Sequence, residues 1–75
     1  MYTIRLNKAE ELKHGETYRY IAKELGITEG FVSNIFRGKK KCSLIIAKGI
    51  ISIRYNIPMD DNKIEIFLFD FFKKC

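Results

Sequence analysis

The sequence predicts a single, mainly α-helical domain of five helices, covering residues 1–75. Two observations set this class: apolar residues recur at helical spacing in several separate stretches, and a glycine or a proline follows most of them. Hydrophobic residues make up 47% of the chain, which suits one small folded core rather than a disordered segment. The expected helices span about residues 7–14, 18–25, 29–36, 43–55 and 59–66.

The most informative stretch is residues 18–37, YRYIAKELGITEGFVSNIFR, which reads as two short helices joined by a sharp turn. Gly26 lies where the first helix must end, because reversing the chain there needs a positive φ angle. Thr28 can cap the second helix through its hydroxyl. Ala22 must be small, since the second helix crosses close above it. The apolar positions of the pair are Ile21, Ala22, Leu25, Ile27, Val32 and Ile35.

A strand and a first helix are expected before this stretch. Residues 1–6 alternate between apolar and polar side chains, which is the period of a short strand, and Leu6 falls on its apolar side. Asn7 and Glu10 have the spacing of a capping box, in which Asn7 caps a helix that ends at Gly15.

A longer helix is expected after residue 43. Ser43 can cap it, and Pro58 ends it because proline disfavours helical geometry in the residue before it. Apolar side chains cover more than half of its circumference, so it is the expected central packing helix. Gly49 within it costs about 1 kcal/mol relative to alanine unless a neighbour approaches closely there. The expected core comprises Ala22, Leu25, Ile27, Val32, Ile35, Leu44, Ala47 and Ile51.

The C-terminal segment IEIFLFDFFKK supports two interpretations. Its apolar residues form a helical stripe, but its density of Ile and Phe also suits a strand. In the second case, residues 2–6 would pair antiparallel with about residues 67–71. A core this small cannot cover every aromatic side chain of the segment. These side chains therefore either cap the core or form a dimer or partner surface. These side chains are Phe67, Phe69, Phe71 and Phe72.

The net charge of +5 suits a polyanionic partner. Between residues 26 and 41 there are four basic residues and one acid, whereas the last sixteen residues carry four acids and three bases. No apolar run approaches the ~20 residues of a membrane span, and the N-terminus has no signal-peptide pattern. We therefore expect a cytosolic protein without a membrane partner.

Catalytic and metal-binding patterns are not apparent. Cys42 and Cys75 are too few and too far apart for a zinc site of the usual spacing. With His14 as the single histidine, no nucleophile, base and orienting group can be assembled. We expect no enzyme, metal, cofactor or small-molecule substrate.

Three segments carry a family resemblance: GETYRYIAKEL, the turn Gly26-Ile27-Thr28, and FVSNIFRGKK followed by CSLIIAKGIISIRYNIPMDD. Over about residues 13–62 the chain resembles the Cro/CI-type helix-turn-helix family of phage repressors and related bacterial regulators. The resemblance implies a five-helix repressor-like domain, in the cytoplasm of a bacterial host, whose second motif helix enters the major groove of DNA.

The resemblance also implies which residues meet the ligand. Outward residues of the second motif helix would meet base edges, and the basic residues after it would meet phosphates. The implied recognition residues are Thr28, Glu29, Gly30, Phe31, Ser33, Asn34 and Arg37. The implied phosphate contacts are Tyr18, Lys39, Lys40 and Lys41.

The chain departs from the family pattern on this same surface. Tyr18 and Glu29 stand where relatives often have Gln, and Gly30 stands where a donor such as Ser is common. Phe36 takes a position that is usually polar and exposed. Phosphates would repel the carboxylate of Glu29. Together with an apolar surface formed by Phe31 and Phe36, this carboxylate would instead suit a protein partner.

Two functions follow from the resemblance. The first is a Cro-like regulator of lytic and lysogenic gene expression that binds a palindromic operator as a dimer. The second is an anti-repressor, or modulator of repression, that binds the DNA-binding domain of a partner helix-turn-helix repressor and keeps it off its operator. The regulator would bind operator DNA and the anti-repressor would bind a repressor. The sequence leaves open whether the dimer is a homodimer or a heterodimer. An antitoxin or restriction-controller role on the same fold is a lesser alternative.

Overall fold

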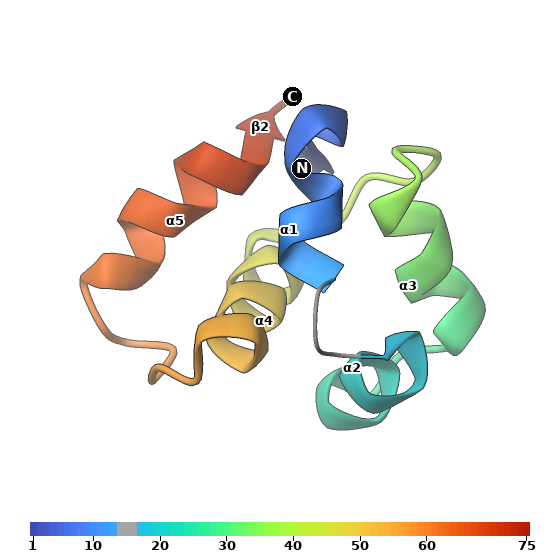
Figure 1. Ribbon diagram of the computed structural model, residues 1–75, viewed down its shortest axis with the longest axis horizontal. Coiled ribbons are helices and arrows are strands. Elements are labelled where there is room, and N and C mark those ends of the chain that lie inside the picture. The colour runs from blue at the N-terminus through green and yellow to red at the C-terminus, as the bar shows by residue number, and fades with distance from the viewer. Residues whose placement is uncertain (14–16) are drawn as a thin grey trace.

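The computed structural model describes residues 1–13 and 17–75. Within them the chain forms five α-helices and one short two-stranded antiparallel sheet, which confirms the mainly helical class (Figure 1). The elements in chain order are β1 (Tyr2–Ile4), the 3₁₀ helix η1 (Leu6–Lys8), α1 (Ala9–Lys13), α2 (Tyr18–Leu25), α3 (Glu29–Phe36), α4 (Leu44–Tyr55), α5 (Lys63–Phe71) and β2 (Phe72–Lys74). No helix in these ranges is long and apolar enough to cross a membrane.

The α2–α3 pair forms as the sequence predicts, with the predicted bounds of both helices. Gly26 ends α2 with φ of 68°, in the left-handed region that an L side chain rarely adopts. The Oγ1 atoms of Thr17 and Thr28 cap the two helices, accepting hydrogen bonds of 3.1 Å from the Tyr20 amide and 3.0 Å from the Phe31 amide. The turn is therefore fixed by local chemistry at both of its ends.

Helix α4 is the central packing element, because it contacts α1, α2 and α5. Ser43 caps it as predicted, accepting from the Ile46 amide at 3.2 Å. A Cβ atom on Gly49 would overlap Leu25 Cδ2, so α2 passes close to α4 at this position. The close approach explains why a glycine is placed inside a helix.

Five of the eight predicted core residues are buried, and Leu25 and Ile27 pack against the core while partly exposed. Leu44 is the wrong member of the set, with 39% of its surface exposed. It is the first residue of α4, and helical side chains lean toward the N-terminus of their helix, so its side chain extends past the end of the core. The buried members are Ala22, Val32, Ile35, Ala47 and Ile51.

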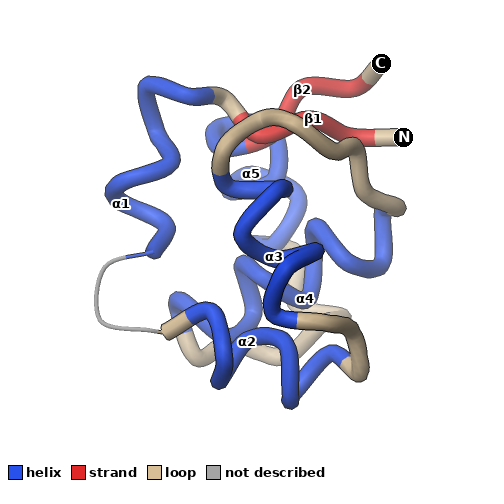
Figure 2. Tube along the Cα trace, turned by 90° about the vertical axis from the view of Figure 1, so that its right-hand side faces the viewer, coloured by secondary structure: helices blue, strands red, loops and turns tan. Residues whose placement is uncertain are grey.

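The two ends of the chain do pair, but not with the predicted residues. β1 pairs antiparallel with β2, with Thr3 opposite Lys73 in the register, and both termini lie at the same end of the molecule (Figure 2). Residues 67–71 belong to α5, as the helical interpretation of this segment predicts, so the strand interpretation is wrong. The predicted fifth helix does form, but it starts at Lys63, whose amide donates to Asp61 Oδ1 at 2.8 Å, and runs to Phe71, so only the predicted bounds of 59–66 are wrong.

The first predicted helix differs at its beginning. Helical geometry starts one residue before Asn7, at Leu6, and the preceding Arg5 makes no side-chain capping bond, so the role of Asn7 as the N-cap is wrong. Because the strand ends before Leu6, its alternation ends too, and Leu6 is 65% exposed. The predicted end of this helix, at residues 14 and 15, lies outside the described residues.

The C-terminal aromatic residues divide between core and surface. Phe71 and Phe72 are 2% and 0% exposed, so they are core residues and not a partner surface. Phe67 is half-buried and stacks on Tyr55 with a centroid distance of 4.2 Å. Phe69 alone of the four is well exposed, because the period of α5 turns it away from α4.

Substituting Ala22 by Phe should destabilise the protein by about 1–3 kcal/mol or more, because the added ring has no room at the α2–α3 crossing. Urea unfolding followed by circular dichroism measures the change in the free energy of unfolding. Lys23→Phe, on the exposed side of the same helix, is the matched control and should change it little. A native-like stability of Ala22→Phe would contradict the packing described here.

Candidate nucleic-acid interface

Helix α3 presents one face to solvent, and the sequence-predicted recognition residues lie on it or beside it. Thr28, Glu29, Gly30 and Arg37 are exposed, whereas Ser33 and Asn34 are half-buried. The opposite side of α3 contributes three residues to the core. Because the helix is anchored by that apolar side, its outer face is held in a fixed orientation.

The loop after α3 carries three exposed lysines, and the end of the helix holds it in place. Gly38 adopts φ of 74° and its amide donates to the carbonyl of Ile35 at 3.0 Å. The amides of Lys39 and Lys40 both donate to the carbonyl of Asn34, at 2.9 and 3.3 Å. Positive charge is thus fixed directly beside the outer face of α3. The exposed lysines are Lys39, Lys40 and Lys41.

The aromatic residues near α3 do not form the apolar surface that the sequence suggests. Phe36 is 4% exposed, so its expected place on a dimer or partner surface is wrong. Its ring stacks on Tyr18 with centroids 5.3 Å apart and 22° between the planes. Phe31 is half-buried against the core. One face of the Tyr18 ring is therefore covered by Phe36. The apolar surface expected from Phe31 and Phe36 is largely buried.

Glu29 has a partner that the sequence analysis missed. Arg19 Nε on α2 lies 3.8 Å from Glu29 Oε2, and the two side chains are 87% and 58% exposed. An exposed pair of this kind contributes about 0–1 kcal/mol to stability. Its larger effect is on the local charge, because the guanidinium offsets the one carboxylate on the outer face of α3. No spacing within either helix signals the pair, which forms only when α2 and α3 cross.

The two cysteines sit on either side of β1. Cys42 is buried, and its backbone exchanges two hydrogen bonds of 2.8 Å with Tyr2. Cys75 is exposed, and its amide donates to the Met1 carbonyl at 3.0 Å. Within residues 1–13 and 17–75, no three His, Cys, Asp or Glu side chains are grouped as metal ligands.

Comparison with known proteins adds no relative: no family model matches this chain, and neither the curated proteins nor the solved structures give a significant match.

Burial raises the pKa of the Cys42 thiol from 9.0 to about 11. The native state therefore holds this proton more tightly than the unfolded state, and the resulting stability is complete below pH 9. We expect the free energy of unfolding to fall by about 2 kcal/mol as the pH rises from 9 to 11.

Chemical denaturation across this pH range, with a reducing agent present, measures the effect. Cys42→Ala is the control: it should be less stable at neutral pH but should lose less stability between pH 9 and 11. Any contribution of Tyr55, whose pKa is also raised by burial, is common to both proteins. Parallel pH profiles would show that the buried thiol does not carry the dependence.

Proposed function

We propose that this protein is a DNA-binding transcriptional regulator of the Cro/CI helix-turn-helix type, acting in a phage-type lytic and lysogenic switch. The observation that carries the proposal is the outer face of α3 together with the loop of residues 39–41, the lysine loop, which is hydrogen-bonded to the last turn of α3. A helix end and its cations are thereby held as one rigid unit. Such a unit can enter a groove and contact the phosphates at its border.

The dimensions of α3 suit this role. An α-helix with its side chains is about 10–12 Å across, which matches the width of the major groove at about 12 Å, and the eight residues of α3 make a rod about 12 Å long. Asn34 and Ser33 can bond base edges from the helix itself, and Arg37 can reach guanine or a phosphate. One such helix reads few base pairs, so two copies on a palindromic operator would supply the specificity.

The position of Phe36 also supports DNA as the ligand. A protein-binding surface on α3 would need exposed apolar area near its centre, since that is where binding energy concentrates in protein interfaces. With Phe36 buried against Tyr18, the exposed residues of α3 itself are polar or glycine, and the loop that follows it is basic. Arg19 beside Glu29 lessens the repulsion between that carboxylate and phosphates.

Replacing Lys39, Lys40 and Lys41 together by Gln should weaken binding to all duplex sequences alike and flatten its salt dependence, because phosphate contacts position a protein without reading sequence. Arg37→Gln should instead change which operator is preferred. Fluorescence anisotropy titrations over a salt series measure both effects. An unchanged salt slope in the triple variant would exclude the lysine loop as a phosphate contact.

A second candidate function rests on Glu29, which is 58% exposed at the start of α3 next to Gly30, whose position offers no side chain. An anti-repressor would place this carboxylate against the basic recognition helix of a partner repressor. Losing one member of a desolvated charge pair in such an interface costs about 2–5 kcal/mol. The DNA-binding and anti-repressor functions therefore respond oppositely to neutralising Glu29.

Glu29→Gln should maintain or raise affinity for operator DNA if the protein reads DNA, since one source of phosphate repulsion is removed. The same change should weaken binding to a repressor's N-terminal domain if the protein is an anti-repressor. Both titrations are made with the wild type and the variant, and Glu24→Gln on α2 serves as the matched control. Repressor binding that is present but indifferent to the change would contradict the charge-complementary interface.

A further inference from the structure

Three segments that are far apart in the sequence share an unusual composition. Residues 1–6, 37–43 and 72–75 hold seven of the fourteen basic residues of the chain and none of its nine acids. Outside these seventeen positions acids outnumber bases. The positive net charge of the protein is therefore a property of these segments, and their arrangement in space decides where a polyanion can bind.

The fold brings the three segments together, with β1 in the middle. One edge of β1 pairs with β2, and its other edge bonds to Cys42 in the loop after α3 (Figure 2). Leu6 continues this contact, because its Cδ2 atom lies 3.0 Å from the point where a Cβ atom on Gly38 would be. The basic loop beside α3 and the basic strand β2 thus belong to one continuous surface.

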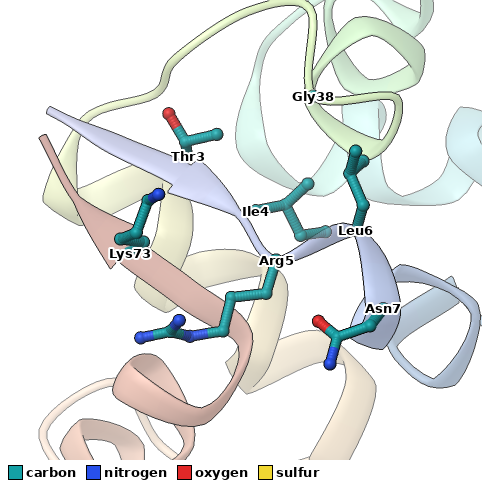
Figure 3. Close-up of a pocket in the computed structure, with 7 residues that line it drawn as sticks. All are labelled: Thr3, Ile4, Arg5, Leu6, Asn7, Gly38 and Lys73. Atoms are coloured by element: carbon teal, nitrogen blue, oxygen red, sulfur yellow. The ribbon is translucent and has the colours of Figure 1, made fainter.

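A hollow of about 410 Å³ lies between these segments (Figure 3). Its polar side chains are those of Thr3, Arg5, Asn7 and Lys73, with Leu6 and the Gly38 turn closing one side. Each of these four side chains can donate hydrogen bonds, the Thr3 hydroxyl also lying 3.0 Å from Cys75 Sγ, and none of the described residues that line the hollow carries a carboxylate. A site with two cations, an amide and a hydroxyl has the chemistry of a phosphate-binding site.

The guanidinium of Arg5 is already held in place. Its Nε donates to the carbonyl of Phe69 at 3.1 Å, which leaves the two terminal nitrogens free to donate elsewhere. Holding the group in this way lowers the entropy that an anion contact would cost. Lys73 lies opposite Thr3 in the sheet register, so its side chain leaves the same face of the sheet as the Thr3 hydroxyl.

The size of the molecule makes contact with a second stretch of DNA backbone feasible. The molecule measures 29 × 24 × 20 Å, whereas the major groove is about 12 Å wide. When α3 occupies the groove, the molecule extends beyond it, so surface next to α3 can reach the bordering phosphates. The hollow begins at the Gly38 turn, directly after the last residues of α3.

We propose that the hollow between β1, β2 and the Gly38 turn binds a backbone phosphate of the same DNA duplex whose groove α3 enters. Arg5 and Lys73 are the residues that contact this phosphate. The inference rests on the proposed DNA-binding function and adds to it a second phosphate contact, built from the two ends of the chain and remote in sequence from α3.

The test compares Lys73→Gln with two controls that remove the same charge. Lys74→Gln alters the next residue of β2, whose side chain leaves the other face of the sheet, and Lys63→Gln alters the exposed first residue of α5. Binding to a mixed-sequence DNA duplex is followed by fluorescence anisotropy over a salt series. Lys73→Gln should lower the slope of log affinity against log salt by about 1, and Lys73→Arg should retain the wild-type slope.

The possible outcomes separate this inference from the proposed function. A wild-type slope in Lys73→Gln, with a lowered slope in the Lys39, Lys40 and Lys41 triple variant, would overturn the phosphate site in the hollow and leave the DNA-binding function standing. Equal losses in Lys73→Gln, Lys74→Gln and Lys63→Gln would reveal only an effect of net charge, and would also overturn the site. Failure of the wild-type protein to bind the duplex would overturn both proposals.

Discussion

The hydrogen bonding of β1 is the constraint on which the arrangement of this small domain depends. Three residues, Tyr2–Ile4, join β2 on one edge and the Cys42 segment on the other, so parts of the chain more than thirty residues apart meet at one strand. These bonds fix the loop after α3 and seat Phe72 in the core. They also bring together residues 1–6, 37–43 and 72–75, the three segments that carry basic residues but no acids. One short strand thus determines both how the core closes and where positive charge collects.

Electrostatics around α3 combines weak and strong contributions. The Arg19–Glu29 pair is exposed, so its direct contribution to stability is small, at about 0–1 kcal/mol. Its value lies in reducing the negative charge on a face otherwise bordered by cations. Lysines that contact phosphates act differently, because each releases counterions and so makes affinity strongly dependent on salt. The Arg19–Glu29 pair therefore adjusts the local charge of the surface, while the lysine loop and the sheet would supply most of the attraction to phosphates.

Much of the fold could be predicted because its signals are local. The bounds of α2 and α3, the positive φ of Gly26 and the caps at Thr28 and Ser43 depend on residues within one or two turns. The errors involve contacts that cross the chain. A helix places Phe69 and Phe71 on different faces and a strand places them on the same face, and the sequence of this segment suits both. Phe36 looked like surface because its stacking partner, Tyr18, belongs to another helix.

The sequence by itself determined the class of the fold, the α2–α3 turn and the basic character of the loop that follows, since all three arise from short-range backbone preferences and from composition. Only the tertiary structure decided which aromatic side chains are buried, which residues of the two ends pair, and that Arg5 and Lys73 share a hollow with the Gly38 turn. The physical reason is that burial, strand register and the local electric field depend on what lies across the core. Those neighbours are set by packing between elements, which no single stretch of sequence contains.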